Sequence, residues 1–113
     1  MFIRERVNTF FMKTDFQLKS RYDGLNLSAV VVEPDQCDPE AVIQIAHGLC
    51  GCKERYLPFM EYMAERGIAS VAGDHRGHGE SVKSIDDLGY MYDGGYMALV
   101  DDMRLITETV HTM

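Results

Sequence analysis

The order of two short apolar runs and the helical segment between them constrains the fold of this chain most strongly. The runs, residues 41–46 and 68–73, carry no charged side chain, which is typical of strands buried on both faces. From Tyr56 to Ala64 apolar residues recur at helical spacing, and Gly67 is a natural C-terminal cap. A strand, a helix and a strand in this order predict a parallel sheet with a helix on its face.

An antiparallel hairpin is expected before this unit. Residues 11–20 and 25–32 partly alternate apolar and polar side chains, as half-buried strands do. Asp23-Gly24 between them is a strong signal for a tight turn.

The last segment has the periodicity of an amphipathic helix. An apolar stripe runs along it, and several polar residues fall outside that stripe. The stripe consists of Tyr96, Leu99, Val100, Met103, Ile106, Val110 and Met113. The residues away from the stripe are Asp101, Asp102, Glu108 and Thr112. A crossover helix in a parallel sheet leads to another strand, and none follows here, so we expect the N-terminal part of a longer fold.

These patterns predict the α/β fold class, with an antiparallel hairpin followed by parallel β-α-β-α. We expect a single domain over residues 11–113. Residues 1–10 have weak patterning and are expected to form a loose leader.

Charge and composition exclude several classes of function. The chain has 113 residues and a formal net charge of −7, so it offers no basic surface for a phosphate backbone, and nucleic acid is not an expected partner. No apolar run approaches the roughly 20 residues of a membrane helix, and the N-terminus lacks the apolar stretch of a signal peptide. The 3 cysteines are poor material for a disulfide framework, so we expect a cytoplasmic protein.

His47-Gly48-Leu49, directly after residues 41–46, is the first motif that could carry chemistry. Ligands of open α/β sheets bind beyond the carboxyl ends of the strands, where this motif is expected. A glycine there lets the backbone turn sharply and present amide N–H groups to a developing negative charge. A His-Gly pair by itself, however, is more often a strand-to-loop glycine beside a buried histidine.

A glycine-rich loop follows the second apolar run. Gly77 and Gly79 indicate a tight loop with close backbone contacts, and Asp74 could pair with Arg76 and pin it. Taken alone, these side chains are interpreted as structural rather than catalytic. The residues singled out in this loop are Asp74, Arg76, Gly77, His78, Gly79 and Ser81.

Together the two motifs resemble the lysophospholipase and monoacylglycerol-lipase branch of the α/β-hydrolases, which is of the serine aminopeptidase S33 type. The resemblance is carried by Ala46-His47-Gly48-Leu49, Glu54-Arg55-Tyr56 and Gly73-Asp74-His75-Arg76-Gly77-His78-Gly79-Glu80-Ser81. It covers roughly residues 15–110 and implies the N-terminal half of an α/β-hydrolase fold. It also implies an enzyme that hydrolyses carboxylic esters, with lysophospholipids or monoacylglycerols as expected substrates and no metal or organic cofactor.

The resemblance further implies a serine nucleophile at a Gly-x-Ser-x-Gly turn, with a later Asp and His completing the triad. Two backbone N–H groups would hold the oxyanion, one after the serine and one from the loop after the His-Gly pair. By position this second donor is the N–H of Leu49, within a loop formed by His47 and Gly48. His47 would orient the loop rather than act as the base. Such a donor is worth about 3–4 kcal/mol of transition-state stabilisation.

The nucleophile is absent from the sequence. The nearest match to Gly-x-Ser-x-Gly has Lys83 in place of the last glycine and follows a loop, so Ser81 is expected to be structural. The acid and the base lie further on in the family, and the 113-residue chain alone is therefore expected to be inactive. Cys50-Gly51-Cys52 departs from the family pattern, because relatives often carry an acidic residue and a histidine in this stretch.

Alternative functions remain open at this point. A zinc site could use His47, Cys50, Cys52, His75 and His78, but their spacing matches the usual rules poorly, so no metal is expected. A decayed or truncated hydrolase acting as an interaction module would keep the same fold signals without the nucleophile. An iminopeptidase or a small-ester esterase is also compatible. By family likeness the next strand would lie beside residues 41–46, and without it the unpaired strand edge favours self-association.

Overall fold

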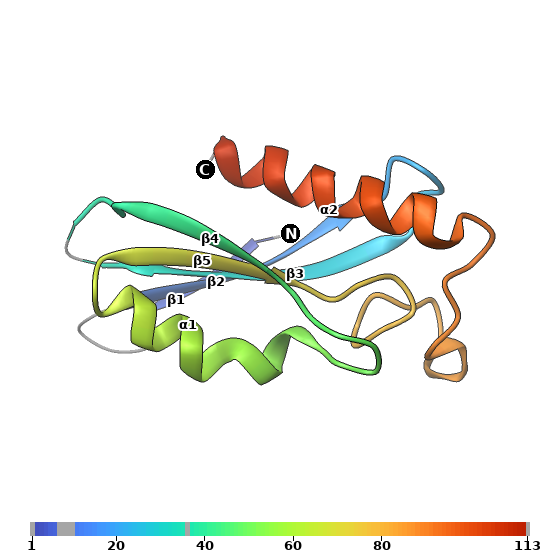
Figure 1. Cartoon of the computed structure of the whole chain (residues 1–113), viewed down its shortest axis with the longest axis horizontal. Coiled ribbons are helices and arrows are strands. Elements are labelled where there is room, and N and C mark those ends of the chain that lie inside the picture. The colour runs from blue at the N-terminus through green and yellow to red at the C-terminus, as the bar shows by residue number, and fades with distance from the viewer. Residues whose placement is uncertain (1, 7–10, 36, 113) are drawn as a thin grey trace.

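The computed structural model describes residues 2–6, 11–35 and 37–112. A five-stranded sheet, with the strand order β1-β2-β3-β5-β4, carries two α-helices on opposite faces (Figure 1). The strands are β1 (Phe2–Arg6), β2 (Phe11–Lys19), β3 (Asn26–Pro34), β4 (Ala41–Ala46) and β5 (Ile68–Gly73). The helices are α1 (Leu57–Ala64) and α2 (Gly95–His111), with short 3-10 helices η1 (Lys53–Tyr56) and η2 (Ile85–Asp87) before them.

The predicted hairpin is confirmed as β2 and β3, which pair antiparallel along their whole lengths. Its turn contains Gly24 at φ +76°, and the amide of Ser20 donates to the Leu25 carbonyl across the turn. The interpretation of residues 1–10 as a loose leader is wrong for Phe2–Arg6, which forms β1 and pairs antiparallel with β2. Backbone hydrogen bonds to the neighbouring strand can hold an edge strand in place. Such bonds leave little trace in the pattern of apolar and polar residues, so β1 was not predicted. Residues 7–10 lie outside the described residues.

The predicted parallel β-α-β unit is also confirmed. β4 and β5 pair in parallel from Ala41↔Ile68 to Ala46↔Gly73, and α1 connects them. Gly67, at φ +86°, ends the helical segment by donating its amide to the Ala64 carbonyl.

β4 differs from the prediction in its burial. It is the last strand of the sheet, and its Val42 side chain is 50% exposed, so the expectation of a strand buried on both faces is wrong. Of the described strands only β5 pairs with β4, so one row of its backbone groups has no strand beside it. Among the described strands, residues 41–46 therefore form an uncovered edge, and this is the edge at which the expected next strand would pair.

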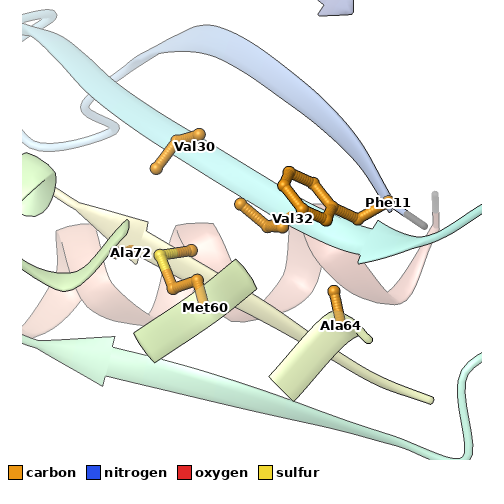
Figure 2. Close-up of a cluster of buried hydrophobic side chains, with 6 residues drawn as sticks. All are labelled: Phe11, Val30, Val32, Met60, Ala64 and Ala72. Carbon is orange, nitrogen blue, oxygen red and sulfur yellow. The ribbon is translucent and has the colours of Figure 1, made fainter. Parts of the chain in front are cut away.

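The alternation of side chains along β3 and β5 builds two cores, one on each face of the sheet. On the α1 face, Met60 points toward the strand residues, as Figure 2 shows. That core consists of Phe11, Val30, Val32, Met60, Ala64 and Ala72. On the α2 face, Ile106 packs against the sheet so closely that a side chain at Gly73 would overlap its Cδ1. The second core consists of Phe16, Ala29, Val31, Val71 and Ile106.

The buried face of α2 differs from the predicted apolar stripe. Tyr96 is 72% exposed and Val100 is 61% exposed, while Asp102 is only 3% exposed. The buried residues of the helix are Ala98, Asp102 and Ile106, which are spaced by one turn. An acidic residue lies on this face because it has buried partners: Arg76 and Ser20 both hydrogen-bond to its carboxylate. Met113, the last residue of the predicted stripe, lies outside the described residues.

Candidate active site

Two loops meet at the edge where the parallel strands end. Because Ala46 pairs with Gly73, the chain leaves β4 and β5 at the same level, and His47 and Asp74 are the first residues of the two loops. The predicted motifs therefore come together at the carboxyl ends of the strands, which is where α/β sheets bind their ligands.

The loop after β4 contains a tight turn over residues 48–51. The amide of Gly51 donates to the Gly48 carbonyl across 3.0 Å, so Leu49 and Cys50 are the central residues. Cys50 has φ +61°, a left-handed conformation that is uncommon for a residue with a side chain. The Leu49 side chain is 87% exposed, and within the described part of the chain its amide donates no hydrogen bond. The turn thus leaves the Leu49 amide without an acceptor among the described residues, at the carboxyl ends of the parallel strands.

His47 is buried and fixes the start of the turn. Its Nε2 accepts a hydrogen bond from the His75 amide across 2.9 Å, which leaves the proton on Nδ1, 2.7 Å from the Gly48 carbonyl oxygen. His75 returns a hydrogen bond from Nε2 to the His47 carbonyl at 3.0 Å. Burial lowers the pKa of His75, and the nearby His47 adds to this effect. Both ring nitrogens of His47 are therefore engaged with backbone groups.

Asp74 does not pair with Arg76, and that sequence prediction is wrong. The Asp74 carboxylate accepts hydrogen bonds from the Lys53 amide at 2.8 Å, from Lys53 Nζ at 2.7 Å and from the Glu80 amide at 3.0 Å. Lys53 is only 2% exposed. Burial alone would lower its pKa, but the hydrogen bonds that its ammonium donates to Asp74, Glu54 and Glu80 outweigh burial and raise it, so the ammonium stays charged.

Arg76 instead turns inward, away from Asp74, and has no exposed surface. Its guanidinium binds Asp102 through Nε at 2.8 Å and Asp23 through both terminal nitrogens at 2.8 and 3.0 Å. Nη2 also donates to the Ser20 hydroxyl at 3.0 Å. The side chain thereby joins the β2–β3 turn, the loop after β5 and α2.

The two glycines of the second loop permit close backbone contacts. Gly79 has φ +51°, and a side chain there would overlap the Asp74 carboxylate. Gly77 has φ +77°, and a side chain there would overlap the backbone of Tyr90. His78 is 7% exposed, and its Nδ1 lies 3.1 Å from the Arg76 carbonyl oxygen.

Ser81 is fully buried at the end of this loop. Its hydroxyl donates to the Asp74 carbonyl at 2.8 Å and accepts from the Ser28 amide at 2.9 Å. These bonds connect the loop to β3. Because the buried Ser81 hydroxyl binds two backbone groups, its contacts are those of a structural residue.

A hollow of about 410 Å³ lies between the two loops. Its walls come from the turn after β4, from the glycine-rich loop and from the segment after η2. The lining residues are Cys50, Gly51, Cys52, Gly77, His78, Gly79, Leu88 and Gly89.

Among the described residues, one group of acidic side chains has the spacing of metal ligands: Glu54, Asp74 and Glu80. The Lys53 ammonium lies 2.7 Å from Glu54, 2.7 Å from Asp74 and 2.9 Å from Glu80. The position that a cation would take is therefore occupied by Lys53. The cysteines and histidines considered as zinc ligands do not form such a group within the same residues.

The comparisons with known proteins identify the family. Residues 37–113 match the family model of the serine aminopeptidases, S33. The chain belongs to this family. No curated protein matches its sequence.

Solved structures of the same fold are esterases and a lipase. A thermostable carboxyl esterase from Bacillus coagulans is 26% identical with a TM-score of 0.79, over 88% of this chain and 32% of that chain. A cold-adapted esterase from an Arctic intertidal metagenomic library is 23% identical with a TM-score of 0.77, over 96% of this chain and 48% of that one. A monoglyceride lipase from Saccharomyces cerevisiae is 16% identical with a TM-score of 0.66, over 84% of this chain and 31% of that one.

The fold is thus the N-terminal part of an α/β-hydrolase, as the sequence predicted, and the chain spans less than half the length of these three structures. In the part of the chain that is described, no helix combines the length and the apolar character needed to cross a bilayer.

Sequence reasoning missed Lys53, Ser20 and Asp23 as members of the site and its support. Lys53 stands between Cys52 and Glu54 in a polar stretch, which usually indicates a solvated surface. Asp23 was interpreted only as a turn residue. The signal that could have found them is the number of charged residues between Asp74 and Ser81, directly after an apolar strand. Charged groups next to a core require partners, and these can come from other segments.

Proposed function

We propose that this chain is the oxyanion-loop part of a serine hydrolase of carboxylic esters. The observation that carries the proposal is the turn over residues 48–51 at the carboxyl ends of β4 and β5, in which the Leu49 amide has no hydrogen-bond acceptor among the described residues. A backbone amide in that position can donate to the oxygen of an ester carbonyl as it gains negative charge. Membership of the serine aminopeptidase S33 family and the fold of the neighbouring esterases support the same reaction.

Each residue of the site would have a limited role in this reaction. The Leu49 amide stabilises the tetrahedral oxyanion, and His47 orients the turn through its bonds to His75 and Gly48. Asp74 and Ser81 hold the second loop in place. The nucleophile, the acid and the base would come from a continuation of the protein, so the 113-residue chain alone would not hydrolyse esters.

Monoacylglycerols or lysophospholipids are the substrates that we propose. The resemblance of the two loop motifs to that branch supports this choice, and so does the shared fold with a monoglyceride lipase. The hollow between the loops is lined mainly by glycines, the two cysteines and Leu88, which suits an uncharged ligand group. Small esters are the competing substrates, and we propose a cytoplasmic location for the protein.

The uncovered edge of β4 favours a second candidate function. An α/β-hydrolase piece without its nucleophile could act as an interaction module through this uncharged strand edge, with a second copy of the chain as the partner. The two candidates differ in whether the protein continues. An in-frame Gly-x-Ser-x-Gly within a few tens of codons after codon 113 supports the hydrolase, and a stop codon there supports the module.

The oxyanion assignment is tested with Leu49→Pro in the complete protein, measured as hydrolysis of a p-nitrophenyl ester. Proline deletes the N–H group and is favoured at the second position of tight turns, so the turn should persist. We expect kcat to fall by about 100- to 1,000-fold. Leu49→Ala keeps the amide and changes only an exposed side chain, and it should retain nearly full activity. Near-normal turnover of a folded Leu49→Pro protein would reject the assignment.

A further inference from the structure

We propose that Lys53 is a positioning residue of the oxyanion turn. Its ammonium and its backbone amide both donate hydrogen bonds to the Asp74 carboxylate. These two bonds fix the turn over residues 48–51 against the loop after β5. The inference rests on the proposed function, because it concerns the geometry of the Leu49 amide.

Two donors of Lys53, its backbone amide and its ammonium, bind the carboxylate of Asp74. The Lys53 amide donates to Oδ1 of Asp74 at 2.8 Å, and Nζ donates to Oδ2 at 2.7 Å. Because one of the donors is a main-chain group, Asp74 fixes the backbone two residues after Gly51 and not merely a side chain. The side chain of Asp74 is fully buried, and hydrogen bonds between charged groups in such a place are short and strong.

The turn is attached at its other end as well. His47, just before Gly48, is tied to His75 by two hydrogen bonds, and Asp74 and His75 are consecutive. Both ends of the turn are therefore fastened to the same point of the loop after β5. Within the turn, the one backbone hydrogen bond is Gly51 to Gly48, and Cys50 adopts an unfavourable positive φ. The turn keeps its shape because its ends are held.

The positive charge of Lys53 is required for this attachment. Asp74 has no exposed side-chain surface, so an uncharged residue at position 53 would leave a buried carboxylate without its ion partner. Glu54 and Glu80 also bind the ammonium, but their side chains are 51% and 68% exposed and can turn to water. Loss of the ammonium would therefore act mainly on Asp74 and, through it, on the turn.

The experiment compares Lys53→Met with Lys83→Met in the complete protein. Lys83 is an exposed lysine of the neighbouring loop, and its replacement should leave kcat and KM unchanged. For Lys53→Met we expect kcat to fall by about 10- to 100-fold, since a small displacement of a catalytic donor has effects of that size. KM should stay nearly constant, because the oxyanion is bound only in the transition state. Unchanged kcat in a folded Lys53→Met protein would overturn the proposal.

Rescue and hydrogen exchange separate positioning from general stabilisation. Lys53→Ala leaves room for n-propylammonium, which should restore part of kcat, whereas n-butanol should not. The amides of Gly51 and of residue 53 donate to the Gly48 carbonyl and to Asp74, and their exchange should accelerate in Lys53→Met while exchange in β5 stays slow. No rescue together with unchanged exchange at Gly51 would mean that Lys53 only stabilises the fold, and would overturn the proposal.

These readouts also distinguish failure of the inference on Lys53 from failure of the proposed function. If the complete wild-type protein hydrolyses no ester, or Leu49→Pro is fully active, the function or its oxyanion assignment fails. The exchange measurement still decides in that case whether Lys53 holds the turn. If Leu49→Pro is inactive and Lys53→Met is fully active, only the inference on Lys53 fails.

Discussion

Arg76 and Asp102 form an ion pair in the interior, with the guanidinium Nε 2.8 Å from a carboxylate oxygen. Neither side chain has more than 4% of its surface exposed. The pair attaches α2 to the loop that follows β5. This charged contact and the apolar packing of Ile106 thus hold α2 against the sheet and its loops.

Removal of this carboxylate should destabilise the protein strongly. We expect Asp102→Ala to lower the free energy of unfolding by about 3–5 kcal/mol, because it leaves a fully buried guanidinium without a partner that it needs. Asp101→Ala, one position away on the same helix, should change it by less than about 0.5 kcal/mol. Urea unfolding followed by circular dichroism measures both. An equal effect of the two substitutions would show that the ion pair is not important for stability.

The stability should also depend on pH through Asp23. Hydrogen bonds from Arg76 lower the pKa of Asp23 from 3.8 to about 2. A carboxyl group whose pKa is lower in the folded state stabilises the protein above the pKa of the unfolded state, and this contribution disappears as pH falls toward the folded value. The free energy of unfolding of wild type should therefore exceed that of Asp23→Asn above pH 4. We expect a difference of only about 1 kcal/mol, because the Asp23 side chain is partly solvated.

That difference between wild type and Asp23→Asn should shrink steadily from pH 4 toward pH 2, the interval that the two pKa values of Asp23 define. Urea unfolding at half-unit steps of pH measures it. Asp102, which also binds Arg76, is present in both proteins and cancels in the comparison. A difference that stays constant down to pH 2 would contradict the ion pair between Asp23 and Arg76.

Two buried serines should respond to the same substitution with opposite signs. The Ser70 hydroxyl is buried in β5 and has no hydrogen-bond partner among the described residues, so Ser70→Ala should be neutral or stabilise by about 1 kcal/mol. The Ser81 hydroxyl joins the Asp74 carbonyl and the Ser28 amide, so Ser81→Ala should destabilise by about 1–3 kcal/mol. Thermal unfolding of the two variants measures both effects. Destabilisation by Ser70→Ala would reveal a partner that the described contacts do not contain.

The edge of β4 should make the 113-residue chain self-associate. Residues 41–46 carry no charge or proline, the features by which natural edge strands avoid pairing with other chains. Val42→Lys introduces a charge at a position that is 50% exposed and should reduce the association. Tyr62→Lys, which introduces the same charge at an exposed position of α1, is the control. Light scattering over a concentration series measures the effect, and a monomeric wild-type chain would contradict it.

Local periodicity was sufficient to predict the main elements of the fold. The hairpin, the β4-α1-β5 unit and the cap at Gly67 each follow from residues that are neighbours in the sequence. The sequence also placed His47 and Asp74 each directly after a strand, and the structure shows that the two loops meet, because the parallel strands end at the same level. These features depend on backbone conformation and burial, which the amino-acid pattern reports directly.

Long-range charge pairing was the part that the sequence did not reveal. A helical pattern assigns Asp102 to the solvent side, since its partner Arg76 lies 26 residues away and the pattern contains no information about it. Asp74 and Arg76 were expected to pair because they are close in sequence, yet each binds a residue from another element. Lys53 was missed for the same reason. Predicting such pairs requires the tertiary contacts themselves.

The partners of Arg76 connect parts of the chain that are far apart in the sequence. Its partners come from the start and the end of the sequence, and Ser20 and Asp102, which also bind each other, are 82 residues apart. Ser20 and Asp23 come from the end of β2 and the turn after it, whereas Asp102 comes from α2. The charge of Arg76 therefore has its full set of partners only when α2 is packed against the sheet, so any displacement of this helix would leave a guanidinium partly unpaired in the interior.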